Sequence, residues 1–352
     1  MSPYDILKQY LFLFDPEEVH LLAEKLLHTT GDLSLGRAML SKMFSYSDPI
    51  LSQSLWDIHF PNPVGLGAGF DKNGHMARAL IALGLGHIEI GTVTPKPQEG
   101  NPKPRIFRHP ERETIQNAMG FNNDGMDTIA KRVEALYPAL VPVGANIGKN
   151  KITPADQAID DYITLVDRFA PISDYLVVNI SSPNTVGLRD LQNESFLTEL
   201  FGEATKRTTK PILLKIAPDM TPQAAIALSQ TAVEAGAKGI IATNTTIDYT
   251  LIPGVKPMGG LSGQILREKS FALFDALASQ MYGHTTLISV GGIDNGEEAY
   301  RRIKAGASLI EVYTGFIFKG PACFGNINRE LAALLRQDGF ESMTQAIGVA
   351  RK

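Results

Sequence analysis

Short apolar runs alternate with polar or glycine-rich turns and amphipathic stretches along the chain after residue 60. A short run that is apolar throughout and bounded by turn residues is typical of a buried parallel strand. Eight such strands are predicted, at Pro63–Gly67, His87–Thr92, Val141–Asn146, Tyr175–Asn179, Ile212–Ile216, Gly239–Asn244, Thr286–Val290 and Leu309–Thr314. Because helical patterns separate the strands, the sequence predicts a series of β/α units.

Capping residues mark the helices between these strands. In the stretch Thr221–Ala235, Thr221 is a favourable N-cap, Pro222 suits the first helical position and Gly236 follows the end. The stretch Glu297–Ala305 likewise stops before Gly306. Eight units in roughly 250 residues is the size of a closed (β/α)8 barrel, also called a TIM barrel, and this is the fold predicted. An open doubly wound sheet is the alternative, although it seldom needs eight consecutive units without a second domain.

The first 45 residues follow another pattern. Asp15 is a favourable N-cap with Pro16 and Glu18 behind it, so a helix is predicted to begin there. Its apolar stripe comprises Val19, Leu22, Ala23 and Leu26, widened by Leu21 and Leu27. A shorter apolar patch precedes it, at Tyr4, Ile6, Leu7, Tyr10, Leu11, Leu13 and Phe14. Amphipathicity alone favours a helical pair packed against the barrel; the alternative is a pair that leaves apolar surface for a lipid-soluble ligand or a membrane interface.

Composition narrows the class of protein. The 352 residues are 44% hydrophobic and 20% charged, which is the profile of a soluble globular protein, and the formal net charge of -4 gives no reason to expect nucleic acid. The single cysteine, Cys323, excludes an intramolecular disulfide and fits a reducing cytoplasm. We expect no metal site, because no histidine pairs with a second ligand at motif spacing. Neither a secretory signal nor an apolar run of roughly 20 residues is present.

Polar side chains follow nearly every predicted strand. The carboxyl ends of parallel strands meet at one mouth, where such barrels place their ligands. There we expect Lys72, Asn146, Asn179, Asn184, Lys215 and Asn244. Ser182 lies between two of these amides as a possible proton acceptor, although local turn chemistry would explain Asn179–Thr185 taken alone. Because so many polar groups are costly to bury unpaired, a polar ligand with several functional groups is predicted.

Glycines at the last strand ends specify part of that ligand. Gly291 and Gly292 follow the seventh strand and Gly315 follows the eighth, where barrels of this kind bind phosphate. The segment Gly259–Gly263 is expected to form a glycine loop that closes over it. A phosphate here, with a ring across the mouth, suits flavin mononucleotide (FMN). Lys215 would then lie near the N1/O2 side of the ring; its competing use is Schiff-base chemistry, which needs a desolvated lysine without partners.

At this level of detail the chain resembles the dihydroorotate dehydrogenases, particularly their class 2, quinone-linked branch. The resemblance extends from the N-terminal helices through Pro321. It is carried by Ala68-Gly-Phe-Asp-Lys72, Ile88-Glu-Ile-Gly-Thr-Val-Thr-Pro95, Met119-Gly-Phe-Asn-Asn123, Asn146-Ile-Gly-Lys149, Asn179-Ile-Ser-Ser-Pro-Asn-Thr185, Ala242-Thr-Asn-Thr-Thr246, Gly259-Gly-Leu-Ser-Gly263 and Val290-Gly-Gly-Ile-Asp294. Several of these motifs run to six or more residues in the right order, so chance agreement is excluded.

The resemblance implies roles for individual residues. One FMN per chain would contact Ala68, Gly69, Lys72, Thr92, Asn146, Asn179, Lys215, Thr243, Gly263, Gly292, Tyr313 and Thr314. Dihydroorotate would be held by Lys72, Asn117, Ala118, Met119, Gly120, Phe121, Asn179, Asn184, Asn244 and Thr245. Ser182 matches the catalytic base, which class 1 enzymes replace by cysteine. Ala118 departs from the pattern, because many relatives carry arginine there. Little is lost if the loop contacts the substrate mainly through Asn117 and backbone N–H groups. If the arginine orders the loop over the substrate, affinity or closure should differ.

The class 2 branch also implies a quinone and a membrane. Residues 1–45 would form an apolar tunnel for quinone and touch the cytoplasmic side of the cell membrane, and residues 46–352 would form the catalytic barrel. His20, Arg108 and Tyr313 align with positions at the quinone end of that tunnel, while a solvated helix residue is the equal alternative for His20. A monomer is expected.

The implied reaction belongs to de novo pyrimidine (UMP) biosynthesis. Ser182 would take a proton from C5 of (S)-dihydroorotate while hydride passes from C6 to FMN, giving orotate, and quinone would reoxidise the flavin. Because a free hydroxyl is a very weak base, a partner must relay its proton. Two rivals stay open at this point. One is another flavin barrel, such as a hydroxy-acid oxidase or ene-reductase; the other is a scaffold without flavin.

Overall fold

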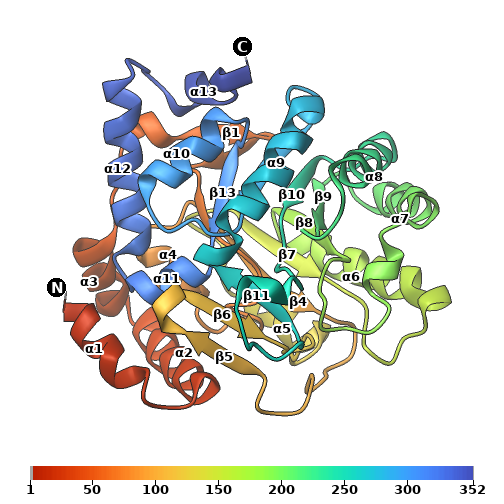
Figure 1. The fold of residues 1–352 in the computed structure, drawn as a ribbon, viewed down its shortest axis with the longest axis horizontal. Helices are drawn as coiled ribbons and strands as arrows, with labels where there is room; N and C mark the ends of the chain where they lie inside the picture. The colour runs from red at the N-terminus through yellow and green to blue at the C-terminus, as the bar shows by residue number, and fades with distance from the viewer. Residues whose placement is uncertain (1–2, 352) are drawn as a thin grey trace.

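The computed structural model describes residues 3–351, and its centre is a closed barrel of eight parallel strands (Figure 1). In chain order the strands are β3 (Val64–Leu66), β4 (His87–Val93), β7 (Val143–Ile147), β8 (Tyr175–Asn179), β9 (Ile212–Ile216), β10 (Gly239–Ala242), β12 (Thr286–Val290) and β13 (Leu309–Val312). The last strand pairs with the first, which closes the barrel. Each predicted strand is present, so the predicted (β/α)8 fold is confirmed and the open sheet is wrong.

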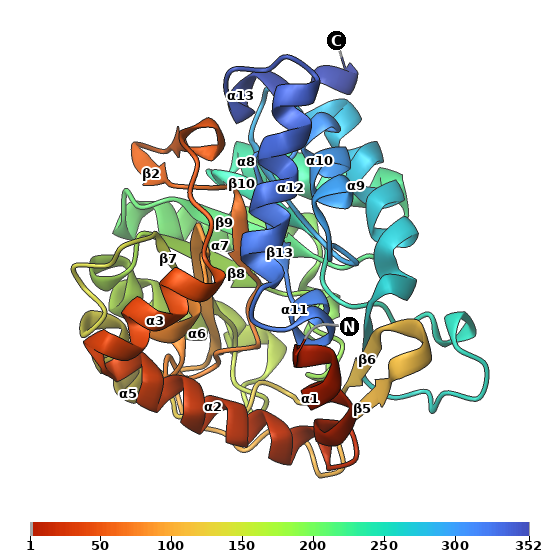
Figure 2. The same cartoon turned by 90° about the vertical axis from the view of Figure 1, so that its left-hand side faces the viewer.

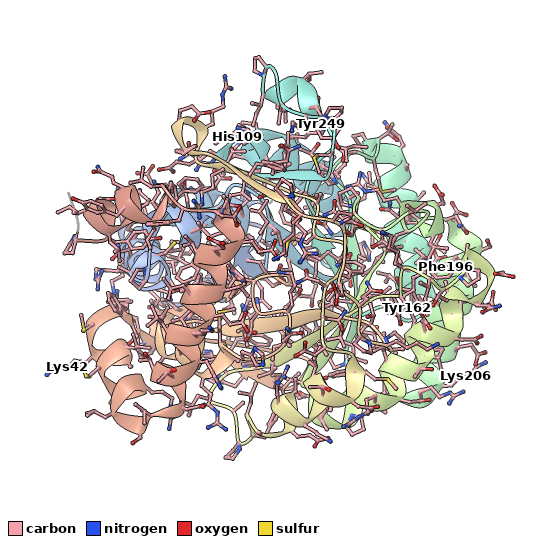
Figure 3. All side chains as sticks on the ribbon, turned by 90° about the horizontal axis from the view of Figure 1, so that it is seen from below. Lys42, His109, Tyr162, Phe196, Lys206 and Tyr249 are labelled. Atoms are coloured by element: carbon pink, nitrogen blue, oxygen red, sulfur yellow. The ribbon has the colours of Figure 1, made fainter. Side chains whose placement is uncertain are left out.

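Helices cover the outside of this barrel. They are α4 (Ala77–Ala82), α5 (Met126–Glu134), α6 (Ala158–Phe169), α7 (Glu194–Arg207), α8 (Pro222–Glu234), α9 (Arg267–Met281), α10 (Gly296–Lys304), α11 (Thr314–Lys319), α12 (Cys323–Gln337) and α13 (Met343–Ala346). The capping predictions for α8 are confirmed, because the Thr221 side chain accepts the Ala224 N–H and Gly236 takes a φ of 115°. Tyr162 of α6 packs on Phe196 of α7 (Figure 3), with ring centroids 6.2 Å apart.

A hairpin that we had not predicted closes one end of the barrel. Strands β1 (Gln53–Leu55) and β2 (Ile58–Phe60) pair antiparallel. Phe60 joins the interior apolar cluster with Tyr175 and Val177 of β8. The hairpin lies at the opposite end of the barrel from α1 and β5 (Figure 2), so the end at which the strands finish is left clear of it.

Alternation along each strand decides which side chains point into the barrel. On β8, Tyr175 and Val177 join the interior cluster, whereas Leu176 and Val178 pack outward against the helices. The same period of two turns Asn179, at the carboxyl end, toward the mouth. Glycines beside the large inward side chains make room for them. A Cβ added to Gly65 would lie 2.1 Å from the His87 ring, one on Gly144 would lie 2.3 Å from the Tyr175 ring, and one on Gly67 would lie 2.8 Å from Glu311 Oε2.

A three-stranded sheet stands beside the open end of the barrel. It is formed by β5 (Ile106–His109), β6 (Thr114–Asn117) and β11 (Gly260–Gly263), with β6 in the middle. The expectation of a glycine loop at Gly259–Gly263 is therefore wrong, because most of this segment is strand β11, which pairs with β6. The backbone bonds to β6 satisfy its polar groups and hold the segment extended.

Three helices precede the barrel, where a helical pair was expected. They are α1 (Pro3–Leu11), α2 (Pro16–Asp32) and α3 (Ser34–Phe44). The start of α2 is confirmed, because the Asp15 carboxylate accepts the N–H groups of Glu17 and Glu18. Leu27, Leu40 and Phe44 pack against the core, so the helices do cover the barrel. Large apolar side chains nevertheless stay exposed on them, at Ile6, Leu7, Tyr10, Leu13, Phe14, Leu21, Leu22, Leu26, Leu33, Leu35, Met39 and Met43.

A buried ion pair fastens α2 to the mouth of the barrel. Glu17 accepts Arg105 Nη2 at 2.7 Å and Nε at 3.2 Å. Burial opposes the charge on Glu17, but the Arg105 guanidinium outweighs it and holds the carboxyl pKa below its ordinary value. Arg105 also donates to the carbonyls of Glu99 and Asn101, so one side chain joins the helix to the segment before β5.

Substituting Glu17→Ala should lower the free energy of unfolding by about 3 kcal/mol, because it leaves the buried Arg105 charge without its partner. Urea denaturation followed by circular dichroism measures this. Glu18→Ala is the matched control: Glu18 is the neighbouring residue, exposed to solvent, and its loss should change stability by less than about 0.5 kcal/mol. Equal losses for the two variants would show that the ion pair is not what fastens the helix.

Candidate active site

One cavity opens at the carboxyl ends of the barrel strands. It encloses about 1010 Å³ of empty space, part of it continuous with solvent. Of the residues assigned from the sequence to cofactor, substrate and catalysis, its lining includes Ala68, Gly69, Lys72, Thr92, Asn117, Met119, Gly120, Phe121, Asn179, Ser182, Asn184, Lys215, Thr243, Asn244, Thr245, Gly263, Gly292, Tyr313 and Thr314. Asn146 and Ala118 are buried just behind the lining. The predicted site residues therefore converge, although their individual roles remain predictions.

Buried amides form a connected network at the ends of β7 and β8. Asn146 Oδ1 accepts from the Thr92 hydroxyl at 2.6 Å and from Asn179 Nδ2 at 3.1 Å. Asn179 Oδ1 accepts from the Ser181 hydroxyl at 3.2 Å, and Ser181 Oγ in turn accepts from Asn244 Nδ2 at 2.9 Å. Each amide is thereby fixed in one orientation, and this presents defined donors and acceptors to a ligand.

Ser182 lies at the turn that follows β8. Its Oγ accepts the Asn184 N–H at 3.2 Å, and the Asn184 side chain donates to Asn117 Oδ1 at 3.0 Å. Tyr162 supports the turn from outside by donating its hydroxyl to the Asn179 carbonyl at 3.0 Å. The segment Asn179–Thr185 thus forms the hydrogen-bonded turn that was expected, and its side chains also line the cavity.

Lys72 supplies a cation at the cavity wall. Burial and the nearby Arg105 charge lower the pKa of Lys72 to about 8. The preceding Asp71 accepts the N–H groups of His75 and Met76, and this holds the segment after β3 against α4. An anionic ligand would therefore meet a partly desolvated ammonium group.

Lys215 lies at the base of the cavity between two glutamates that the sequence analysis did not single out. Its ammonium donates to Glu311 Oε2 at 2.9 Å and to Glu89 Oε2 at 3.3 Å. Burial disfavours the charge, but the two carboxyls outweigh it and raise the pKa of Lys215. A paired, protonated lysine cannot attack a carbonyl, so the geometry disfavours the Schiff-base alternative. We call Glu89, Lys215 and Glu311 the floor cluster.

Two arginines shape the glycine turn after β12. Arg302 Nη2 donates to the Gly291 carbonyl at 2.9 Å, and Arg267 Nε donates to the Gly292 carbonyl at 2.9 Å. In a trans peptide the N–H points away from its carbonyl. The N–H groups of Gly292 and Ile293 are therefore turned away from these arginines, toward the cavity side, as an anion site requires.

Backbone contacts hold the segment Asn117–Phe121 over the cavity. The Ala118 N–H donates to the Arg105 carbonyl at 2.7 Å, and its carbonyl accepts from Asn101 Nδ2 at 3.0 Å. Gln98 donates to the carbonyls of Gly120 and Phe121, each at 3.1 Å. These hydrogen bonds hold the segment in place, so its order does not need a side chain longer than that of Ala118.

The three residues assigned to the quinone lie along the seam between the N-terminal helices and the barrel. The His20 ring packs edge-on against Phe70 at 5.2 Å, and Phe70 packs against Tyr313 at 5.9 Å. His20 is half-buried, so it is not a freely solvated residue, and burial and the Lys72 charge lower its pKa to about 4. Arg108 donates to the Phe14 carbonyl at 2.9 Å and lies over the Phe12 ring.

The His, Cys, Asp and Glu side chains of residues 3–351 form no group of three or more able to hold a metal ion. None of the helices in this range is both long and apolar enough to cross a membrane. Cys323 is buried in α12, and burial raises its thiol pKa to about 12.

Known proteins match this chain over nearly its full length. The sequence profile of the dihydroorotate dehydrogenase family matches residues 50–335. A dihydroorotate dehydrogenase (quinone) from a Nitratiruptor species is 55% identical over 98% of this chain and 99% of its own. The enzyme of that name from Mycobacterium marinum is 45% identical, covering 98% and 97%. A crystal structure of DHODH from Eimeria tenella in complex with ferulenol superposes with a TM-score of 0.83 at 34% identity, covering 96% of each chain.

Identity of this extent, over both the barrel and the N-terminal helices, is far above what a shared fold alone would give. The chain belongs to the dihydroorotate dehydrogenase family, in its quinone-dependent class.

Proposed function

We propose that this chain oxidises (S)-dihydroorotate to orotate in pyrimidine biosynthesis, with one bound FMN, Ser182 as base and a membrane quinone as electron acceptor. The observation that carries the proposal is the convergence of Ser182, Lys72 and the oriented amides on one cavity. When bound, FMN accepts the hydride that leaves C6 of the substrate and passes the electrons on to quinone.

The cavity fits FMN at its phosphate end and at its ring end. The Gly292 and Ile293 N–H groups are suited to the phosphate, together with Thr314 and Gly263. Gly69 is suited to the ring, because its φ of 102° favours glycine and the missing Cβ leaves the backbone open beside Tyr313. Lys215 at the base is suited to hydrogen-bond a polar edge of the ring, because it lines the cavity as a protonated donor.

The same cavity leaves polar atoms ready for dihydroorotate. Asn184 Oδ1 and Thr245 Oγ1 are buried and have no hydrogen-bond partner among residues 3–351. Unpaired buried acceptors are costly, so a ligand that donates to them is the economical explanation. Asn117, Asn179 and Asn244 would complete the contacts to the substrate ring, and Lys72 would pair with its carboxylate.

Ser182 needs help to act as a base. The Asn184 N–H on its Oγ stabilises negative charge there, which is one of the effects that lower a hydroxyl pKa. The hydroxyls of Thr185 and Thr245 lack partners in the described part of the chain and are the candidates to relay the proton. The proton from C5 would thus leave through the Asn179–Thr185 turn.

The N-terminal helices, residues 1–45 of the predicted division, are suited to deliver quinone from a membrane. Their exposed leucines and aromatics would enter the interface on the cytoplasmic side of the cell membrane, with the protein bound peripherally as a monomer. The rings of His20, Phe70 and Tyr313 lead from α2 to the cavity, and Arg108 lies near the start of that route.

Adding dihydroorotate to the purified protein without oxygen should bleach its flavin absorbance, and a soluble quinone, but not fumarate or NAD, should restore it.

Substituting Ser182→Ala should slow the bleaching by about 100-fold or more, because a positioned base contributes at least that much, while flavin stays bound. Stopped-flow absorbance measures the rate. Ser181→Ala is the control, since Ser181 is buried outside the lining, and it should slow the reaction less. A rate unchanged by Ser182→Ala would rule out the base assignment.

The affinity for orotate should depend on the charge of Lys72. The ammonium form prevails below its pKa of about 8, so affinity should be constant there and fall about tenfold per pH unit above it. Flavin absorbance during orotate titration gives the dissociation constant at each pH. Lys72→Met should bind weakly, without this dependence. A wild-type affinity that stays constant from pH 7 to pH 10 would contradict the pairing.

Replacing Leu22 and Leu26 by Glu should weaken binding to lipid vesicles, because both side chains are exposed on α2 and charge is disfavoured in an apolar interface. Vesicle sedimentation measures binding, and reduction by dihydroorotate should be unchanged. Leu140→Glu is the control, because Leu140 is 85% exposed in the loop before β7. If it weakens binding equally, the contact is not specific to the helices.

A further inference from the structure

The floor cluster places two carboxyls and one ammonium where solvent does not reach. The side chains of Glu89 and Glu311 have no exposed surface, and Lys215 is nearly as buried. They come from β4, β13 and β9, so they meet across the barrel interior. Glu311 and Lys215 also line the base of the cavity.

The two carboxyls converge on one ammonium group, since Lys215 Nζ lies 3.3 Å from Glu89 Oε2 and 2.9 Å from Glu311 Oε2. If both were ionised, two buried negative charges would face a single ammonium out of reach of solvent, so we expect one carboxyl to hold a proton. The remaining oxygens, Glu89 Oε1 and Glu311 Oε1, have no hydrogen-bond partner within residues 3–351. The geometry is that of two acids sharing one proton, as like charges at short distance cannot both be ionised.

The neighbouring titratable groups do not change this charge count. His87 of β4 and Tyr175 of β8 face the cluster from the closed end of the barrel. Burial lowers the pKa of His87 to about 4 and raises that of Tyr175, so both are neutral near pH 7. The ionised groups at the base are therefore Lys215 and a single carboxylate.

Hydrogen bonds identify Glu89 as the ionised member. Glu89 Oε2 accepts from Lys215 Nζ, from Asn146 Nδ2 at 3.0 Å and from the Ala68 N–H at 3.3 Å. Glu311 Oε2 accepts from Lys215 alone. Three donors favour charge on Glu89. Burial and the charge on Glu89 together raise the pKa of Glu311 well above its ordinary value.

We propose that Glu89 and Glu311 share one proton and thereby keep the base of the cavity neutral, so that this pair sets the reduction potential of the flavin bound above it. The proposal rests on the proposed function for the presence of flavin. Reduction adds electrons to the ring, so a net positive base would raise the potential and a net negative base would lower it. Glu89 and Glu311 are positioning residues in this scheme, since they act through Lys215, Asn146 and the Ala68 backbone.

Substituting the two glutamates by glutamine should therefore have a non-additive effect on the flavin potential. In Glu89→Gln, Glu311 loses its proton and pairs with Lys215; in Glu311→Gln, Glu89 already does so. Each single variant therefore keeps a neutral base. Only the double variant leaves the Lys215 ammonium without a carboxylate to offset its charge. Redox titration of the flavoproteins at pH 7 should show single-variant ratios of reduced to oxidised flavin within about threefold of wild type. The double variant should exceed wild type by at least tenfold, which is a positive shift of about 30 mV for a two-electron couple.

Asp48→Asn is the matched control. Asp48 is a nearly buried carboxylate that pairs with Arg336 and caps the turn Pro49–Leu51, before the hairpin that closes the far end of the barrel. Asparagine keeps the cap, and the flavin potential should not move. A single variant that shifts the potential by about half as much as the double variant, or more, would show that the wild-type base is not neutral, and would overturn the proposal. A double variant at the wild-type potential would overturn it equally.

Infrared spectroscopy tests the shared proton without relying on flavin. Wild-type protein should show the carbonyl stretch of a buried, protonated carboxyl that shifts on deuteration, and both single variants should lose it, while Asp48→Asn retains it. Absence of this band from wild type, or its persistence in both single variants, would refute proton sharing even if the double variant loses flavin. Failure of dihydroorotate to bleach the flavin would instead count against the proposed substrate and leave these results standing.

Discussion

The barrel interior accepts large polar side chains because glycines on adjacent strands make room for them. A Cβ on Gly65 would collide with the His87 ring, and one on Gly144 would collide with the Tyr175 ring. Interiors are packed too densely to absorb such overlaps. The site at the mouth depends on the space that these glycines leave, since without it β4 and β8 could not keep the positions from which Glu89 reaches Lys215 and Asn179 reaches the cavity.

The alternation of side chains along each strand then decides which residues reach the cavity. Positions two apart face the same side, so an apolar residue that fills the closed end is followed by a polar one nearer the mouth: Leu213 precedes Lys215 and Val177 precedes Asn179. The cross-strand register pairs Asn179 with Lys215. Polar groups that would be costly to bury singly satisfy one another, and only the atoms that face the cavity remain for ligands.

Much of this was predictable from the sequence, and the omissions have physical causes. The eight strands and the convergent lining followed from short apolar runs with polar ends, which reflect local pattern. The β1–β2 hairpin and the β5–β6–β11 sheet were missed because their strands are short and stabilised by tertiary contacts. Glu89 and Glu311 had a signal that was overlooked: each is a lone acid within an apolar strand, in Ile-Glu-Ile and Ile-Glu-Val. Such an acid needs a buried partner, and only the fold shows that both share Lys215.

Arg105 has a consequence for how this architecture can change over time. It joins Glu17 of α2 to the carbonyls of Glu99 and Asn101, and its own carbonyl accepts the Ala118 N–H of the segment over the cavity. The N-terminal helices are therefore not a detachable module. A lineage that discarded them would leave the buried guanidinium of Arg105 without its carboxylate partner beside the segment Asn117–Phe121. It would have to alter both together, so the extension and this segment should evolve as one unit.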